Sequence, residues 1–170
     1  TAAASNKAPV VLKMARNAEP GIFIPWLIDD NTALFTMANV YDGLTARDWS
    51  TPGQFKIIPK LAESYTQQAD PKTWRFKLRQ GVKFSNGEDF TAESVKYTFE
   101  QYVNLQPAYV YVSLWAAGWP PAVEIENAQS VLIKTPKPQP SLPRLITRFG
   151  MLPVQAAQVG GEIERLAHRQ

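Results

Sequence analysis

The sequence of 170 residues contains no cysteine. Without thiol groups the chain can form neither disulfide bonds nor metal sites that use thiolate ligands. This composition suits an exported protein that needs no management of its redox state, but the absence of cysteine does not by itself fix a cellular compartment.

Histidine is nearly absent as well, because His168 is the only one in the chain. A hydrolase or transferase needs a positioned base and nucleophile, and the helix predicted over Glu162–Arg169 at the end of the chain is a poor platform for them. We interpret His168 as a solvated residue near the negative end of that helix dipole. Motifs of the forms GxxxxGK[ST] and GxGxxG are missing too. The sequence therefore predicts no enzyme, no catalytic residue, no metal site and no cofactor.

Paired carboxylates are the one hint of acid chemistry. Asp29 and Asp30 are adjacent, but no DxDxDG loop surrounds them to form a calcium site. Two acids directly before Asn31 and Thr32 are more simply explained as negative charge at the start of a helix. An enzyme that uses carboxylates alone stays open as an alternative.

Long apolar runs are also missing. No segment approaches the roughly 18–20 apolar residues that cross a bilayer, and no signal peptide opens the chain. Residues 1–9, TAAASNKAP, are small, polar and without pattern, so we expect a flexible N-terminal tail. Such a tail is typical of a mature end left after removal of a signal sequence or of the linker of a lipid anchor. The alternative is a disordered remnant of cloning.

The charge balance gives a weak signal for a binding partner. The net charge is +3, with 18 Lys and Arg against 15 Asp and Glu, and no dense basic block occurs. Between Trp74 and Arg79 the cations alternate with apolar residues, which is typical of the solvated face of a strand. A self-contained basic module that binds nucleic acid or an acidic partner stays open as the alternative function.

The most informative segment is Trp74–Glu100, WRFKLRQGVKFSNGEDFTAESVKYTFE. Its first residues alternate between apolar and cationic side chains, so they predict a strand with one buried and one solvated face. Gly81 permits a turn, and a second short alternation at Val82 and Phe84 leads into the turn residues Ser85-Asn86-Gly87.

A helix is predicted directly after this turn. The Thr91 side chain is suited to accept a hydrogen bond from a free amide of the first helical turn, and Glu93 suits the positive end of the helix dipole. Val95, Phe99 and Tyr102 recur at helical spacing and form one apolar stripe, which we interpret as core packing.

Shorter patterns predict the other elements. The first part of the chain predicts a strand at Val11–Arg16, a loop at Asn17–Asp30, and a helix capped by Asn31 or Thr32, which has Leu34, Met37, Ala38 and Tyr41 on one face and a left-handed end at Asp42-Gly43. The middle part predicts a turn at Trp49–Gly53, a strand at Phe55–Ile58 stopped by Pro59, and a hairpin of Glu63–Gln68 with Thr73–Leu78. The last part predicts a second hairpin of Val123 and Ile125 with Val131 and Ile133 through Asn127–Ser130, an extended connector containing Pro136, Pro138, Pro140 and Pro143, and a short helix at Leu142–Phe149. Strand, loop and helix open an α/β unit, and the hairpins suggest a small antiparallel sheet. The proline spacing also fits a polyproline ligand, but we favour a rigid loop.

Several sequence motifs in the chain resemble those of one protein family. LRQGVKFSNGEDFTAESVKYTFE is similar to the phrases LRxGVKFxxG and xxTAExVxxxxE of the large solute-binding proteins of bacterial ABC importers, solute-binding family 5. The segments VYDGLTARD, IIPKLAESY and VEIENAQSVLIKTPKPQPSLPRLIT also look like family phrases, with Tyr65 in place of the usual tryptophan. The resemblance covers roughly Val11 to Pro153.

The resemblance implies a fold class of α/β, with an incomplete first lobe of the type II periplasmic-binding-protein kind and a mixed sheet that carries a small antiparallel subdomain. We expect residues 10–170 to form the N-terminal part of lobe I, because the chain stops before the family's GTGPxxx phrase and lacks the second lobe. The family's first lobe also recruits strands from the far C-terminus. Without those strands we expect an uncovered sheet edge and self-association.

The resemblance also implies a function and a site. It implies an extracytoplasmic substrate-binding component of a bacterial ABC transporter, periplasmic or membrane-anchored, which captures a peptide, a nickel chelate or a related small solute. The implied partners are the solute and the ABC permease subunits, with no nucleic acid and with membrane contact only through the permease or a lipid anchor. The candidate ligand-binding residues are Trp26, Asn31, Trp115 and Arg148. For both tryptophans, packing in the core stays an equal alternative.

Overall fold

The computed structural model describes residues 31–48, 50–51, 53–104 and 121–154. The predicted strand Val11–Arg16, the loop that carries Trp26, the segment that carries Trp115 and the predicted helix Glu162–Arg169 lie outside these ranges. The elements in chain order are α1 (Asn31–Met37), β1 (Thr45–Asp48), β2 (Lys56–Pro59), β3 (Ala62–Gln67), β4 (Thr73–Leu78), α2 (Ala92–Asn104), β5 (Ala122–Asn127), β6 (Ser130–Lys134), α4 (Leu142–Leu145) and the 3-10 turn η2 (Ile146–Arg148).

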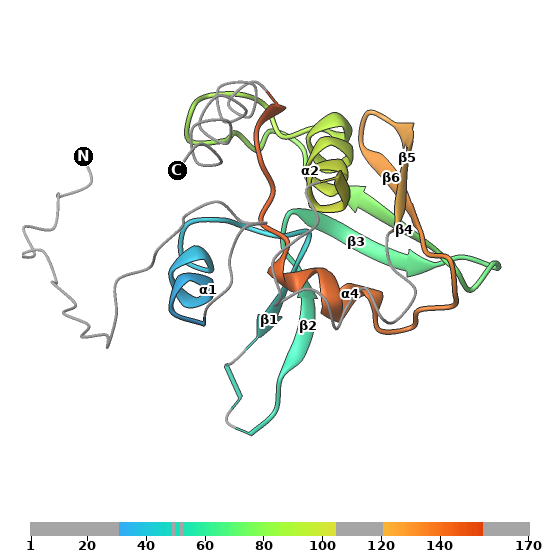
Figure 1. Cartoon of the computed structure of the whole chain (residues 1–170), viewed down its shortest axis with the longest axis horizontal. Coiled ribbons are helices and arrows are strands. Elements are labelled where there is room, and N and C mark those ends of the chain that lie inside the picture. Colours follow the sequence, from blue (N-terminus) through green and yellow to red (C-terminus); the bar gives the residue numbers. More distant parts are fainter. Residues whose placement is uncertain (1–30, 49, 52, 105–120, 155–170) are drawn as a thin grey trace, which may run out of the picture.

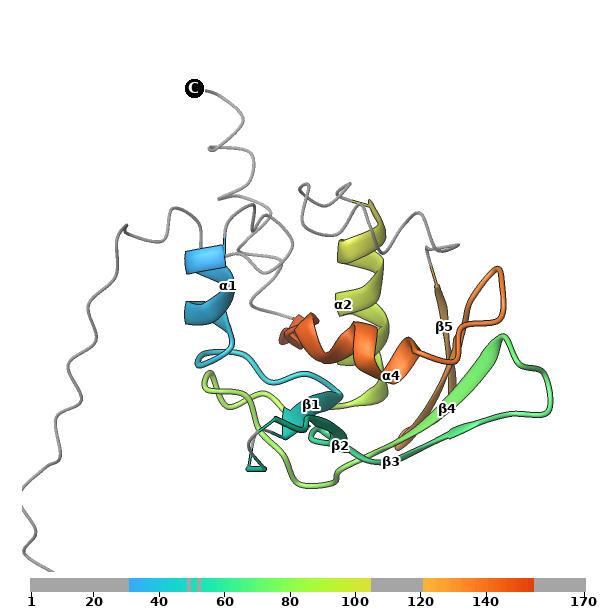
Figure 2. The same cartoon turned by 90° about the horizontal axis from the view of Figure 1, so that it is seen from below.

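A four-stranded antiparallel sheet in the order β3-β4-β6-β5 is the centre of the described structure (Figure 1). Both predicted hairpins, β3 with β4 and β5 with β6, are confirmed. In Figure 2, α2 and α4 lie on the same side of this sheet. All strand pairs in the described ranges are antiparallel. The parallel strands of the expected mixed sheet would involve the predicted strand Val11–Arg16, which lies outside these ranges.

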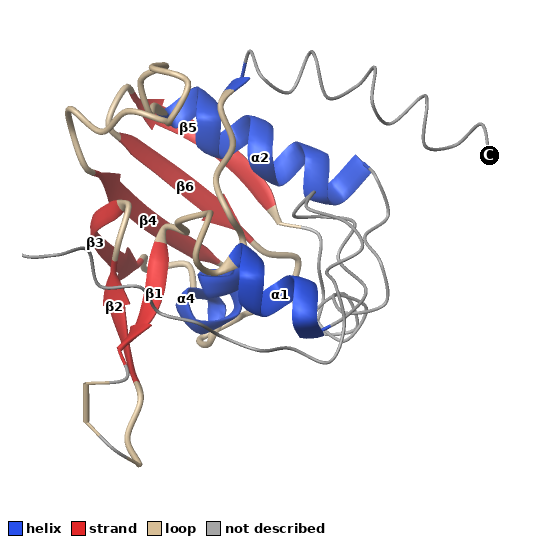
Figure 3. Ribbon diagram, turned by 90° about the vertical axis from the view of Figure 1, so that its left-hand side faces the viewer, coloured by secondary structure: helices blue, strands red, loops and turns tan. Residues whose placement is uncertain are grey.

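β1 and β2 form a separate two-stranded antiparallel ribbon that extends from the body (Figure 3). β2 begins at Lys56 and includes Pro59 as its last residue, so the prediction that Pro59 stops the strand is wrong by one residue. The ribbon tolerates this proline because a two-stranded pair has only edge strands, where a missing N–H group breaks no central ladder.

The alternating pattern of β4 is confirmed and explains which face of the sheet is buried. Phe76 and Leu78 are buried, whereas Arg75 and Lys77 are exposed. β6 contributes buried side chains to the same core. The largest fully buried side chains are Tyr102, Phe76, Phe99, Phe149, Leu44, Leu78, Ile133, Leu142, Ile146 and Val95.

The turns before α2 use the glycines that the sequence predicts. Gly81 and Gly87 have φ angles of 68° and 91°, in the left-handed region that glycine adopts without a steric penalty. The predicted apolar stripe of α2 is confirmed, since Val95, Phe99 and Tyr102 are all buried. At the start of α2 the Thr91 amide donates a hydrogen bond to the Ser94 hydroxyl at 3.3 Å.

α1 differs from the prediction at both ends. Asn31 already lies inside the helix, so the predicted cap at Asn31 or Thr32 is wrong, and α1 ends at Met37 rather than near Tyr41. The Asn39 side-chain amide donates to the Phe35 carbonyl at 2.8 Å. This bond competes for a carbonyl that a continuing helix would use, and the chain turns instead.

Gly43 does not adopt the predicted left-handed conformation. Among the described glycines, only Gly53, Gly81 and Gly87 have a positive φ. A Cβ atom at Gly43 would lie 3.1 Å from the Phe149 carbonyl oxygen. Another backbone segment passes close by position 43, and glycine leaves it the most room.

The proline-rich connector is fixed to the sheet. The Trp74 indole donates to the Gln139 carbonyl at 3.1 Å, and the Thr135 amide donates to the Lys72 carbonyl at 2.8 Å. Pro143 lies in the first turn of α4, where its missing N–H costs no helical hydrogen bond. The predicted helix over Leu142–Phe149 is confirmed as α4 followed by η2.

Candidate functional site

Of the four residues expected to bind ligand, only Arg148 has a described side chain. Trp26 and Trp115 lie outside the described ranges, and Asn31 is placed only as the first residue of α1. Arg148 is exposed at the end of η2. Whether these four residues meet in one site therefore stays a prediction.

Arg148 is mounted on a firmly packed segment. Its neighbour Phe149 is buried and stacks on Phe99 of α2 with ring centroids 5.4 Å apart. The buried Thr45 hydroxyl at the start of β1 donates to the Pro143 carbonyl at 2.7 Å, which joins β1 to α4. The backbone that presents Arg148 is thus held from both sides.

Two further arginines gather near Arg148 in the folded chain. Arg47 comes from β1 and Arg144 from α4, and we call Arg47, Arg144 and Arg148 the arginine cluster. Burial lowers the pKa of Arg47 below its ordinary value, and repulsion from Arg148 and Arg144 lowers it further. Arginine still carries its charge at neutral pH, so the cluster is a concentrated positive site.

Sequence reasoning did not single out Arg47 or Arg144. Both residues stand in quoted family phrases, Arg47 in VYDGLTARD and Arg144 in SLPRLIT. The only signal was the placement of a cation in each phrase. Because the two phrases lie far apart in the chain, only the contact of β1 with α4 and η2 brings the charges together.

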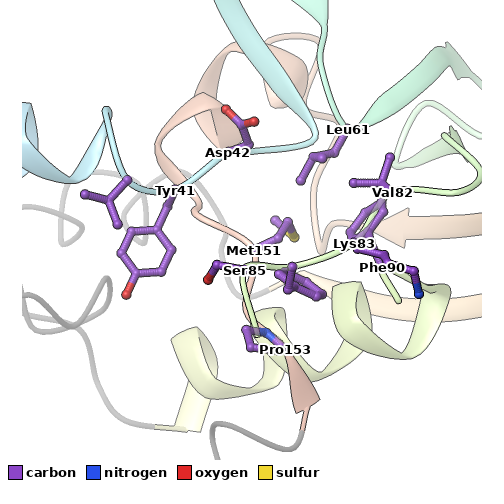
Figure 4. A pocket seen from close by; sticks show the side chains of 11 residues that line it. Tyr41, Asp42, Leu61, Val82, Lys83, Ser85, Phe90, Met151 and Pro153 are labelled. Atoms are coloured by element: carbon purple, nitrogen blue, oxygen red, sulfur yellow. The ribbon is translucent and has the colours of Figure 1, made fainter. Parts of the chain in front are cut away.

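A pocket of about 250 Å³ lies on another part of the molecule, between the chain after α1, the turn before α2 and the segment after η2 (Figure 4). Its apolar wall includes Leu61, Val82, Phe90 and Met151, and its polar lining residues are Asp42, Lys83 and Ser85.

Both charged residues at this pocket already have partners. Asp42 pairs with Lys60 at 3.6 Å, and Lys83 pairs with Asp89 at 2.5 Å. Because both charged side chains are paired, the pocket has no free group poised for acid–base chemistry.

The described part of the chain offers neither a metal site nor a membrane-spanning helix. Residues 31–48, 50–51, 53–104 and 121–154 contain no group of three or more His, Cys, Asp or Glu side chains placed to hold a metal ion. No helix within that part of the chain is long and apolar enough to cross a membrane.

Similarity to known proteins extends over most of the chain. The model for "Bacterial extracellular solute-binding proteins, family 5 Middle" matches residues 56–167. The nickel-binding periplasmic protein of Escherichia coli is 35% identical over 107 residues, which are 63% of this chain and 20% of that protein. The periplasmic oligopeptide-binding protein OppA of Haemophilus influenzae is 30% identical over 121 residues, 71% of this chain and 21% of that protein. The chain thus spans about a fifth of the length of these relatives.

Solved structures of such proteins share the fold. NikZ from Campylobacter jejuni, in complex with Ni(L-His), has a TM-score of 0.68 at 26% identity, over 83% of this chain and 27% of that one. Haemophilus influenzae OppA in complex with the peptide RPPGFSPFR has a TM-score of 0.70 at 23% identity, over 83% of this chain and 30% of that one. The predicted fold, an incomplete type II periplasmic-binding-protein lobe, is thereby confirmed. The family match covers more than half of the sequence, so the chain belongs to the bacterial extracellular solute-binding proteins of family 5.

Proposed function

We propose that this chain is part of the extracytoplasmic solute-binding component of an ABC importer and that it performs no catalysis. The observation that carries the proposal is the family match over residues 56–167, together with relatives whose names specify nickel and oligopeptides. The proposed solute is a peptide, a nickel chelate or a similar small molecule, and the proposed partners are the ABC permease subunits. The proposed location of the protein is the periplasm or the extracytoplasmic side of the membrane, to which it would be anchored.

In the proposed mechanism this lobe supplies one wall of a cleft. Trp26, Asn31, Trp115 and Arg148 contact the solute, because aromatic rings give large contact areas and the arginine fork pairs with carboxylates. A second lobe closes over the bound solute and creates the surface that the permease recognises. A solute drives this closure only by binding the closed state more tightly than the open state.

The charges on β4 weigh against the alternative of a nucleic-acid module. The Arg75 guanidinium binds the Glu126 carboxylate through two contacts of 2.9 and 2.6 Å, and Lys77 pairs with Glu63 at 2.9 Å. A cation that is already paired gains less from a phosphate than a free one. The alternating cations of this strand therefore make a poor phosphate-binding stripe.

Calorimetry tests the proposed function. Oligopeptides and a nickel–histidine chelate would be titrated into the 170-residue chain and into a protein that also carries a second lobe. We expect tight binding only by the two-lobe protein, with Arg148→Ala weakening it by about tenfold or more, since a charged hydrogen bond contributes roughly 1.5–3 kcal/mol. Equal and tight binding by the chain alone would refute the two-lobe mechanism.

A further inference from the structure

The arginine cluster has a feature that the solute-binding proposal does not explain, namely a buried nitrogen without a partner. Arg47 is half-buried on β1, and its Nε atom is inaccessible to solvent. Among the described residues this Nε has no hydrogen-bond partner. A buried N–H group of a charged side chain without a partner is costly, so such a group is usually paired in a working protein.

The charge of the cluster is also not balanced by the described part of the chain. Six ion pairs occur there, and none of them includes Arg47, Arg144 or Arg148. The nearby carboxylate of Asp48 instead accepts a hydrogen bond from the Ser50 amide at 2.9 Å. Arg144 and Arg148 repel the Arg47 guanidinium, and an anion bound beside these groups would reduce that repulsion.

Two of the three guanidinium groups contact the same aromatic ring, that of Phe55. The Cζ atom of Arg144 lies 5.1 Å from the centroid of the Phe55 ring, and that of Arg47 lies 5.9 Å from it. Both distances allow a cation–π interaction. Phe55 is 46% exposed, so an apolar surface adjoins the positive charges.

The backbone beneath the cluster is fixed. Arg47 pairs with Ile57 in the β1–β2 ribbon, and β1 is joined to α4 by the bond from Thr45 to Pro143. The backbone at Arg47 and Arg144 is therefore held in place, so that a ligand has to order only the side chains.

We propose that the arginine cluster binds the carboxylate of a small solute, with Arg47 and Arg144 as binding residues in addition to Arg148. The guanidinium fork matches the two oxygens of a carboxylate, and the Phe55 ring favours a solute with an apolar group beside it. This proposal rests on the proposed function, in which the carboxylate belongs to the solute that the protein captures.

Nuclear magnetic resonance of the whole 170-residue chain tests the site. The probe is hydrocinnamate, a carboxylate with an aromatic ring, and the control is hydrocinnamamide, its neutral amide. We expect hydrocinnamate to shift the arginine Nε–H signals assigned to Arg47 and Arg144 in a saturable way, and the amide to leave them unchanged. Equal shifts with both compounds, or no shift with either, would overturn the proposal.

Substitutions separate a built site from general attraction between charges. Arg144→Gln and Arg47→Lys should each weaken hydrocinnamate binding by about fivefold or more, since each removes charged hydrogen bonds. Lys137→Gln removes one positive charge at an exposed position outside the cluster and should leave the affinity unchanged. If all three variants lose affinity equally, the attraction is unspecific and the proposal fails.

The experiment also separates this site from the proposed function. Carboxylate binding by the chain, with no solute captured by the two-lobe protein, would keep the site and refute solute capture. Solute capture that is unaffected by Arg144→Gln and Arg47→Lys would keep the function and refute the site. Nε–H signals that report a bound carboxylate before any probe is added would mean that the chain supplies its own counter-charge, and this outcome also overturns the proposal.

Discussion

At the scale of single residues, two glycines show how closely the chain after η2 packs against the chain after α1. A Cβ atom at Gly150 would lie 2.5 Å from the Cβ of Tyr41, and the Met151 amide next to it donates to the Asp42 carbonyl at 2.9 Å. At Gly43 the closest contact of an added Cβ is longer, 3.1 Å to the Phe149 carbonyl oxygen. Neither glycine has a positive φ, so space rather than backbone conformation selects them.

These two contacts predict a graded loss of stability. Gly150→Ala should lower the free energy of unfolding by about 1–3 kcal/mol, because overpacking forces the backbone to move. Gly43→Ala should cost less, since its closest contact is longer. Urea unfolding followed by circular dichroism measures both values, and a Gly150→Ala variant as stable as the parent would show that the two segments do not approach this closely.

At the scale of elements, the β3–β4 hairpin depends on a carboxylate in its turn. The Asp70 side chain accepts hydrogen bonds from the Lys72 amide at 3.1 Å and from the Thr73 hydroxyl at 2.9 Å. These bonds, that of the Lys72 amide first, lower the pKa of Asp70 below its ordinary value. The ionised Asp70 side chain therefore stabilises the folded hairpin through these two bonds.

This arrangement predicts a pH dependence of stability. Because the pKa of Asp70 is lower in the folded state, its contribution is present above the unfolded pKa of about 3.9 and is lost as the pH falls through the folded value. In Asp70→Asn the decline of stability at acidic pH should be shallower than in the parent chain. Unfolding in urea at a series of pH values from about 6 down to 2 measures the difference. Parallel pH profiles for the two proteins would contradict the role of Asp70.

At the scale of the whole molecule, the described sheet ends on both sides in a strand with only one partner, and β5 is the more exposed of these two edge strands. The outer edge of β5 pairs with no other strand in the described ranges, and most of β5 is exposed. Ile125 in this strand is 38% exposed, and Phe35 on α1 is 67% exposed. Unpaired edges and exposed apolar side chains favour association with a second chain.

We therefore expect the 170-residue chain to associate with itself in a concentration-dependent way. Ile125→Lys should reduce this association, because a lysine on an edge strand disfavours pairing of strands between chains. Sedimentation velocity at several protein concentrations measures the effect. Circular dichroism of the variant shows whether the fold is kept, and Val40→Ser serves as a control exchange of an exposed apolar residue away from this edge. A folded Ile125→Lys variant that associates as strongly as the parent would exclude the β5 edge as the contact.

Features that depend on neighbours in the chain could be predicted from the sequence. Alternation in β4, the turn glycines Gly81 and Gly87, and the apolar stripe of α2 were all predictable, because strand and helix periods place side chains on a face whatever surrounds them. The fold class was predictable from the motifs of the family, because these motifs occur along most of the chain.

Features that depend on contacts between distant segments became visible in the folded chain alone. The carbonyl of Phe149 approaches Gly43 closely, a contact that could not be inferred from the helix before this glycine. The side chain of Asn39 ends α1, a competition between two local hydrogen bonds that periodicity does not reveal. The arginine cluster exists because β1 packs against α4 and η2, and a charge pattern read along the chain cannot show which cations meet in space.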